Sequence, residues 1–298
     1  MNTPRTAVRT NCEICAGPGE LWLEKGRRRL VRCRACGFTW IPDGVVHTPR
    51  GLSIYEDESL NFYAQYTDYY RDESAVDAAR AKADWVSRFV PSGGRLLDVG
   101  ANVGAFVKCA SEQFDAVGIE PNPGAVAWAR EHMHASVEIG SIFDEVEAYV
   151  GRFDAVTMFD VIEHVDEPTA ALRQCRRYLA ADGMLFVTTP DIGSVCSRLL
   201  GRAWYYVDLE QHVSLFSLAN LTRLLASQGF EIVDRRTFGR RYRFSYIEQR
   251  LKDLSHQSAL LRVVHALSVP LRLAPAWYVP INFGDVIGIA ARARPAGV

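Results

Sequence analysis

Four cysteines near the start of the sequence are its clearest chemistry-bearing residues. They form two pairs with C-x-x-C spacing, Cys12 with Cys15 and Cys33 with Cys36, and seventeen residues separate the pairs. Each such turn directs two thiolates at one point, and two turns joined by a hairpin give the tetrahedral set of sulfur ligands that Zn²⁺ prefers. Four protein ligands leave no open position on the ion. We therefore predict a structural zinc site, with two local disulfides or an iron centre as the alternatives.

The residues between the two cysteine pairs have the pattern of a β-hairpin. Residues 20–24 and 29–32 alternate in character on either side of Lys25-Gly26-Arg27. A unit of this size builds little hydrophobic core, so metal binding is expected to supply most of its folding free energy. We predict a zinc ribbon over residues 1–41 that serves as a docking module or a lid.

A second set of functional side chains follows short apolar runs further along the chain. The run Leu96-Leu97-Asp98-Val99 leads into the turn Gly100-Ala101-Asn102-Val103-Gly104, and a second run ends in Glu120, twenty residues after Gly100. Glycines let a ligand approach the backbone, a helix N-terminus offers N–H donors, and a carboxylate at this spacing can accept both hydroxyls of a ribose. The turn lacks the central glycine of a G-x-G-x-x-G dinucleotide motif, which argues against a dehydrogenase.

Alternating helices and strands must position these side chains. Residues 75–90 have helical periodicity and end at Pro91. Strands are expected at residues 95–99, 115–119, 136–139, 153–159 and 183–189, followed by a helix capped by Ser217 and by two final strands, residues 230–237 and 286–293. This order predicts an α/β domain with a doubly wound, mainly parallel sheet.

Four stretches in this region resemble the successive motifs of class I S-adenosylmethionine-dependent methyltransferases: LLDVGANVGAF, VGIEPNP, FDAVTMFDVIEHV and GMLFVTTP. The resemblance covers roughly residues 75–293 and is greatest to the group that includes the ubiquinone-pathway O-methyltransferases, which share D-V-I-E-H. It implies a Rossmann-like, seven-stranded methyltransferase sheet, which we place in residues 73–298, after the small N-terminal zinc-ribbon module. The G-A-N turn departs from the family's usual G-x-G, a tolerated change.

The same resemblance implies which residues bind S-adenosylmethionine. The glycine turn would hold the methionine part, the acid after the second strand the ribose, the residues after the third strand the adenine, and the end of the fourth strand would face the methyl group. Carried over to this sequence, the cofactor-binding residues are Asp98, Gly100, Asn102, Gly104, Glu120, Ser141, Ile142 and Asp160.

Two histidines are the candidate catalytic residues. His212 precedes the helix capped by Ser217, as a histidine does in related methyltransferases, and an imidazole titrates near neutral pH, so it is the first choice for the base that deprotonates a hydroxyl acceptor. The alternative is that it supports the helix. His164, in the E-H pair with Glu163, either lines the pocket, binds a cation or has a structural role beneath the cofactor.

Two further segments are expected to approach the acceptor. Residues 42–72 contain Tyr55, Tyr63, Tyr66, Tyr69 and Tyr70 and are interpreted as an aromatic linker or lid. Residues 240–284, rich in basic and aromatic side chains, are interpreted as a cap over the acceptor site that contacts a phosphate of the substrate.

Composition and charge limit the class of protein and its partners. The 298 residues are 48% hydrophobic and carry a net charge of −1, which excludes a disordered chain and one that is basic throughout. Residues 1–50 carry 9 basic and 4 acidic side chains, residues 51–150 carry 7 and 17, and residues 235–298 carry 11 and 3. The two ends are therefore basic and the predicted cofactor region is acidic.

The start of the chain has no apolar run typical of a secretory signal, and no apolar stretch is long enough to span a membrane, so a cytoplasmic location is expected.

These observations predict a methyltransferase that O-methylates a small molecule, either a sugar or a natural-product intermediate. An RNA methyltransferase is one alternative, because some rRNA methyltransferases also carry an N-terminal zinc module, although the acidic cofactor region opposes it. A sugar C-methyltransferase is the second. The basic C-terminal part is equally compatible with a peripheral contact to a membrane-bound substrate.

Overall fold

A computed structural model gives the structure of the chain. It describes residues 10–26, 28–44, 73–209, 211–243, 252, 266 and 278–294. The five tyrosines of the expected linker and most of the expected acceptor cap lie outside these residues, so both assignments stay predictions.

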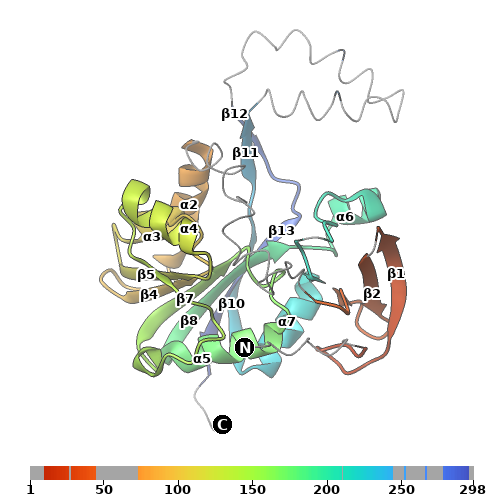
Figure 1. Cartoon of the computed structure of the whole chain (residues 1–298), viewed down its shortest axis with the longest axis horizontal. Helices are drawn as coiled ribbons and strands as arrows, with labels where there is room; N and C mark the ends of the chain where they lie inside the picture. The colour runs from red at the N-terminus through yellow and green to blue at the C-terminus, as the bar shows by residue number, and fades with distance from the viewer. Residues whose placement is uncertain are drawn as a thin grey trace.

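A seven-stranded sheet forms the centre of the molecule (Figure 1), in the order β10-β13-β8-β7-β4-β5-β6. Its strands are β4 (Arg95–Val99), β5 (Asp115–Glu120), β6 (Val137–Ile139), β7 (Phe153–Phe159), β8 (Leu179–Pro190), β10 (Phe230–Thr237) and β13 (Val286–Ala293). The strands from β4 to β8 run parallel, whereas β13 pairs antiparallel with both β8 and β10. This order confirms the predicted methyltransferase sheet.

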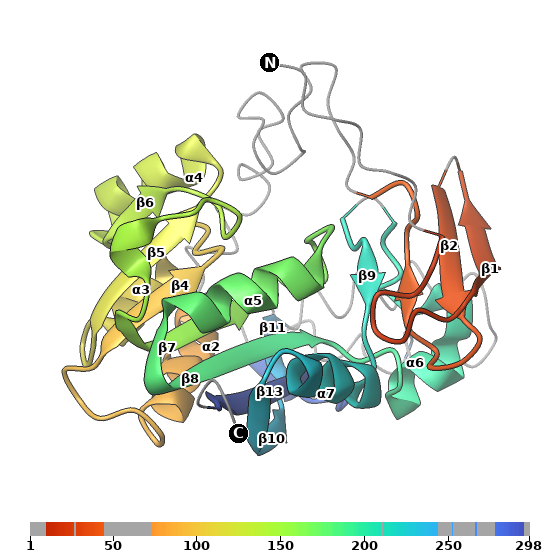
Figure 2. The same ribbon diagram turned by 90° about the horizontal axis from the view of Figure 1, so that it is seen from below.

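Helices cover both faces of this sheet. These helices are α2 (Glu73–Val86), α3 (Ala105–Ala110), α4 (Pro123–Trp128), α5 (Pro168–Tyr178) and α7 (Leu218–Ser227), whereas α6 (Val195–Leu200) lies off the sheet, at the end of the molecule away from β6 (Figure 1 and Figure 2). Successive strand residues point to opposite faces, so Leu96 packs in the core with α2, α3 and α4, whereas Leu97 packs in the core with α5 and α7. Both faces are thus apolar, as expected of a buried parallel sheet.

The predicted boundaries differ from the structure at two places. The helix expected over residues 75–90 spans Glu73–Val86, and residues 87–90 form turns before Pro91. The strand expected over residues 183–189 extends from Leu179 to Pro190, because Leu179 already pairs with Phe153 of the neighbouring strand. The remaining strands of the sheet match their expected ranges to within a residue.

A second, smaller sheet contains the N-terminal hairpin, β1 (Gly19–Lys25) and β2 (Arg28–Cys33). β3 (Thr39–Trp40) pairs with β2 on one side and with β9 (Ser214–Leu215) on the other. Figure 2 shows this sheet beside α6, at the end of the molecule away from β6. The hairpin confirms the sequence prediction, but the fourth strand comes from the methyltransferase part of the chain and was not expected.

A two-stranded antiparallel sheet follows β10, in which β11 (Arg240–Arg243) pairs with β12 (Tyr278–Ile281). It forms the two ends of the segment interpreted as an acceptor cap. Among the described residues, no helix is long and apolar enough to cross a membrane.

Candidate functional site

The turn after β4 has the backbone conformation that a close ligand requires. Gly100 and Gly104 have φ angles of 73° and 75°, and Asn102 between them has φ 51°. A Cβ atom on Gly100 would lie 2.6 Å from Val161 Cγ2, and one on Gly104 would lie 2.7 Å from the Ala135 Cβ atom. Both positions therefore require glycine for conformation and for space. α3 begins directly after this turn and directs its first N–H groups toward it.

Glu120 is buried at the end of β5, with its carboxylate held by the backbone. Its Oε2 accepts a hydrogen bond of 2.9 Å from Asn102 N, and its Oε1 accepts one of 3.0 Å from Asn122 N. Each carboxylate oxygen can accept more than one hydrogen bond. The two backbone donors fix the direction of the carboxylate at the edge of the glycine turn.

Asp98 lies beneath the same turn and is also buried. Thr157 Oγ1 donates a hydrogen bond of 2.6 Å to Asp98 Oδ1. Burial raises the pKa of Asp98 to about 7, although the hydrogen bond from Thr157 opposes this shift. This hydrogen bond from β7 fixes the Asp98 side chain near the end of β4, two residues before the turn.

The residues after β6 form a tight polar turn. Ser141 N donates to Asp144 Oδ2 at 2.7 Å, and Phe143 N donates to Ser141 Oγ at 3.3 Å. Ile142 is buried, while the Phe143 side chain is 46% exposed. β6 pairs with β5, which brings this turn to the same edge of the sheet as Glu120.

Asp160 lies at the end of β7 and is paired with a lysine that the sequence analysis did not single out. Lys82 Nζ, from α2, lies 2.9 Å from Asp160 Oδ2, and Thr188 Oγ1 lies 3.0 Å from Asp160 Oδ1. Asp160 has a φ angle of 59°. The next residue, Val161, lies against Gly100, so the end of β7 contacts the glycine turn directly.

A cluster of three titratable side chains lies beyond the end of β7. It consists of Glu163 and His164, which follow β7 in the chain, and of His212 from a later part of the chain. Their ligand atoms all lie within 4.8 Å of one another, and the two imidazole rings have a centroid separation of 4.8 Å. Glu163 is 1% exposed, and its Oε2 accepts a hydrogen bond of 2.9 Å from Thr189 Oγ1. The chemistry of these donors would also suit a divalent cation. The structure thus brings together the two histidines that the sequence separates by 47 intervening residues.

Backbone hydrogen bonds determine the tautomer of both histidines. His212 Nδ1 lies 2.7 Å from the Tyr206 carbonyl oxygen, and His164 Nδ1 lies 2.9 Å from the Gln211 carbonyl oxygen. A carbonyl oxygen only accepts, so each Nδ1 carries a proton and each neutral ring keeps its lone pair on Nε2. Burial lowers the pKa of both rings, and the charge of His164 lowers that of His212 further. Burial raises the pKa of Glu163.

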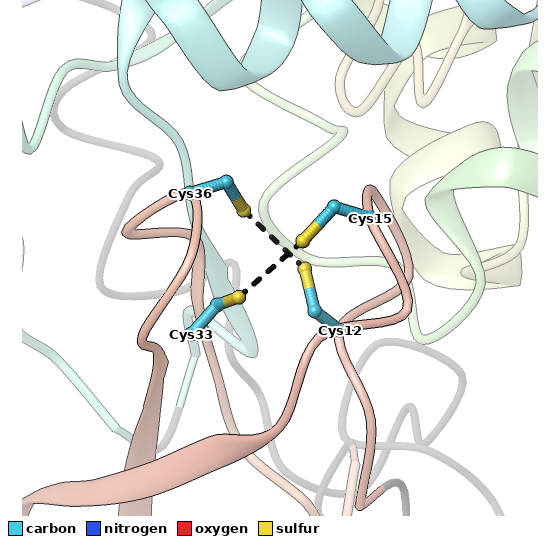
Figure 3. Close-up of side chains that lie close together, drawn as sticks. All are labelled: Cys12, Cys15, Cys33 and Cys36. Carbon is cyan, nitrogen blue, oxygen red and sulfur yellow. Dashed lines mark hydrogen bonds between the residues drawn. The ribbon is translucent and has the colours of Figure 1, made fainter.

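The four N-terminal cysteines converge as the sequence analysis predicts (Figure 3), with their sulfur atoms all within 4.8 Å of one another. Cys12 Sγ lies 3.5 Å from Cys36 Sγ, and Cys15 Sγ lies 3.4 Å from Cys33 Sγ. These distances exceed the S–S bond of about 2.05 Å. They are close to the edge of about 3.8 Å expected for a tetrahedron with Zn–S bonds of about 2.3 Å. The arrangement is therefore consistent with a four-sulfur zinc site.

A family model described as "Methyltransferase domain" matches residues 74–235 of the chain. The chain belongs to this family. It is a class I S-adenosylmethionine-dependent methyltransferase whose N-terminal module carries a four-cysteine cluster consistent with zinc.

Curated relatives of this methyltransferase include ubiquinone biosynthesis O-methyltransferases. That of Xanthomonas oryzae pv. oryzae is 36% identical over 117 residues, which are 36% of this chain and 48% of the relative. That of Xylella fastidiosa is 29% identical over 147 residues, or 45% of this chain and 60% of the relative. The chain spans about half the length of the curated relatives it matches.

Solved structures support the fold. A SAM-dependent methyltransferase from Thermotoga maritima, described as a possible histamine N-methyltransferase, has a TM-score of 0.51 at 19% identity and covers 80% of this chain and 97% of its own. A SAM-dependent methyltransferase from Archaeoglobus fulgidus has a TM-score of 0.53 at 16% identity, covering 78% of this chain and 99% of its own.

The residues of this methyltransferase fit the cofactor that the family implies. The turn at Gly100 has no room for a side chain, and Glu120 presents an oriented carboxylate beside it. Both lie at the carboxyl ends of neighbouring parallel strands, where ligands bind in open α/β sheets. Sequence reasoning missed Lys82, because α2 carries no motif, and Thr189, because its motif GMLFVTTP was used only to identify a strand.

Proposed function

We propose that this methyltransferase transfers a methyl group to a hydroxyl oxygen of a small molecule and that His212 accepts the hydroxyl proton. The observation that carries the proposal is the hydrogen bond of 2.7 Å between His212 Nδ1 and the Tyr206 carbonyl oxygen. Nδ1 donates this bond, and burial together with His164 favours the neutral ring, so His212 Nε2 has a lone pair at neutral pH. The O-methyltransferases among the relatives support hydroxyl as the acceptor class.

The proposed cofactor residues are those named from the sequence, and each group of them would hold a different part of S-adenosylmethionine. Gly100, Asn102 and Gly104 would hold the methionine part, with Asp98 beneath them. Glu120 would accept the ribose hydroxyls, Ser141 and Ile142 would flank the adenine, and Asp160 would face the methyl group. The contact of Val161 with Gly100 supports this arrangement, because Val161 lies two residues before Glu163 and so places the cluster of Glu163, His164 and His212 near the glycine turn.

S-adenosylmethionine, when bound, supplies an electrophilic methyl group on a sulfonium. The residues of this chain would orient the acceptor hydroxyl toward that methyl group. His212 Nε2 would accept the hydroxyl proton as the oxygen is methylated. The Nδ1 hydrogen bond to Tyr206 O would then stabilise the imidazolium, and the neighbouring Glu163 carboxylate would favour its positive charge.

The charge distribution favours a small acceptor over RNA. The segment that carries the cofactor turn, residues 51–150, has ten more acidic than basic side chains. Contacts to a phosphate backbone require the opposite sign, and they weaken steeply with salt. A screen for labelled methyl transfer into phenols, sugar nucleotides and RNA identifies the acceptor class, and a methylated carbon in the product would favour the sugar C-methyltransferase alternative.

The substitution His212→Ala tests the base. With the acceptor found in this screen, we expect kcat to fall by about 10²- to 10⁴-fold while the affinity for S-adenosylmethionine stays unchanged. The wild-type rate should hold its plateau below pH 6.5, because a base with a lowered pKa stays unprotonated to lower pH. His132→Ala, which removes an exposed histidine, is the matched control. Wild-type turnover of His212→Ala across the pH range, with cofactor still bound, would show that His212 is not the base.

A divalent cation bound by Glu163, His164 and His212 is the competing role for the same side chains. A cation would activate the acceptor oxygen directly, and the rate would then rise with added Mg²⁺ or Mn²⁺ and fall in Glu163→Gln. A rate that is independent of both ions favours the base.

A further inference from the structure

Residues 211–216, here called the His212 segment, contain β9, the strand by which the methyltransferase part of the chain joins the smaller sheet. On the inner side, Val213 N and Ser214 N donate hydrogen bonds of 2.9 and 3.1 Å to the Glu163 carbonyl oxygen. On the outer side, β9 pairs with β3 of the N-terminal module, and Ile41 N donates a hydrogen bond of 2.8 Å to Val213 O. The segment that bears the proposed base is thus held by Glu163 from one side and by the ribbon from the other.

Aromatic packing reinforces the outer contact. The rings of Phe38 and Trp40 stack with centroids 5.7 Å apart, and the Phe38 ring lies 5.1 Å from that of Phe216. All three side chains are fully buried. Phe38 and Trp40 therefore belong to the same hydrophobic core as Phe216 and the α7 residues behind it. A core of this kind tolerates little displacement of one side against the other.

Both cysteine turns also contact the methyltransferase domain through hydrogen bonds. In the first turn, Glu13 Oε1 accepts a hydrogen bond of 2.7 Å from Thr169 N in the first turn of α5. In the second, the Cys36 carbonyl oxygen accepts one of 3.2 Å from Asn220 Nδ2 in α7. α5 follows Glu163 and His164 in the chain, and α7 follows His212. The two cysteine turns thus bind to the two elements that flank the histidine cluster.

We infer that the metal-loaded ribbon positions His212, with Trp40 and Asn220 as positioning residues. Four cysteine ligands on one ion would fix the two turns relative to each other, and β3 emerges from the second turn. β3 has only two residues, so its register against β9 depends on that turn as well as on the packing of Phe38 and Trp40. The inference rests on the proposed function for the role of His212, but the order of the segment can be measured without an acceptor.

Amide hydrogen exchange on the full-length protein tests the inference. The metal-loaded protein is compared with protein treated with a strong chelator and with chelated protein reloaded with Zn²⁺. We expect exchange in residues 211–216 to rise roughly tenfold or more on metal removal and to return on reloading. Exchange around Asn102 and Asn122 and the affinity for S-adenosylmethionine should change less than about threefold, because the contacts of the described ribbon residues given above are with β9, α5 and α7 rather than with the cofactor turn. Loss of metal with unchanged exchange in residues 211–216 would overturn the inference.

If chelation unfolds the whole chain, the variant Asn220→Asp tests the positioning of His212 by the ribbon instead. It keeps the side-chain oxygen that accepts from Ser217 N in the helix cap but removes the Nδ2 donor to Cys36. We expect full metal content, wild-type cofactor affinity and exchange raised several-fold in residues 211–216. Glu20→Ala, which removes an exposed ribbon carboxylate paired with Arg34, should leave exchange at the wild-type level. Wild-type exchange in Asn220→Asp would contradict the inference.

The exchange result and the proposed function fail independently of each other. If His212→Ala retains turnover while metal removal still raises exchange in residues 211–216, the base assignment is wrong and the positioning by the ribbon stands. With a known acceptor, Asn220→Asp should lower kcat more than it raises KM.

Discussion

Glu120 combines a buried position with two backbone hydrogen bonds, and this combination distinguishes it from the carboxylates on the surface. Glu112, for example, is exposed and pairs with Arg80, which lowers the pKa of Glu112. The carboxylate of Glu120 is instead oriented by Asn102 N and Asn122 N toward the glycine turn. An oriented, buried acceptor of this kind would lose little entropy on binding the ribose hydroxyls proposed for it above.

The substitution Glu120→Ala should weaken cofactor binding. Hydrogen bonds to a charged group contribute about 1.5–3 kcal/mol, so the Kd for S-adenosylmethionine is expected to rise by tenfold or more. Isothermal titration calorimetry measures this directly, with the exposed Glu112→Ala as control. A wild-type Kd in Glu120→Ala would remove Glu120 from the cofactor site.

The start of α7, the helix that follows His212, depends on local capping. Ser217 Oγ accepts from Asn220 N, and the Asn220 side chain accepts from Ser217 N, which forms a capping box at the start of α7. Asp191 Oδ1 also accepts from Leu218 N. The beginning of α7 is therefore fixed directly after the His212 segment.

Replacing Ser217 by alanine tests the cap. Loss of the side-chain acceptor should lower the free energy of unfolding by about 1 kcal/mol, which corresponds to a decrease in Tm of roughly 2–4 °C for a domain of this size. Differential scanning calorimetry provides the measurement. Ser227→Ala, at the exposed end of the same helix, is expected to change Tm by less than half of this. Equal shifts in the two variants would show that the cap does not stabilise α7.

The whole molecule is built around a core that the ribbon and the methyltransferase sheet share. Cys12, Cys33, Phe38 and Trp40 pack in one cluster with residues of β7, β8, α5 and α7. Two parts that share a core are expected to unfold together rather than as independent domains.

Phe38→Ala tests this coupling at the scale of the molecule. Truncation of a fully buried phenylalanine costs about 3–5 kcal/mol. We expect a single unfolding transition at a lower temperature than in the wild-type protein. Metal release and loss of secondary structure in the methyltransferase domain should have the same midpoint temperature. The control is Leu21→Ala, because Leu21 is 57% exposed on the ribbon. Two separate transitions in the wild-type protein would show that the ribbon folds on its own.

Most of the sheet could be predicted because each strand carries a local pattern. The run before Asp98 and the run before Asp160 are short, apolar and closed by polar residues or glycine, and the strands at residues 153–159, 230–237 and 286–293 have the expected bounds. The start of β8 was missed because its first residues, Leu179-Ala180-Ala181-Asp182, have no strand-like alternation, and of these only Leu179 pairs with β7, before a shift in register.

By itself the sequence determined the four-cysteine cluster, the glycine turn with Glu120, and the family, because each depends on spacing between residues close in the chain. Only the tertiary structure brought His164 beside His212, paired Lys82 with Asp160, and made β9 the fourth strand of the ribbon sheet. These contacts join residues from about 50 to 175 positions apart. No local pattern encodes such pairs, because they arise when separate elements bury their apolar faces against one another.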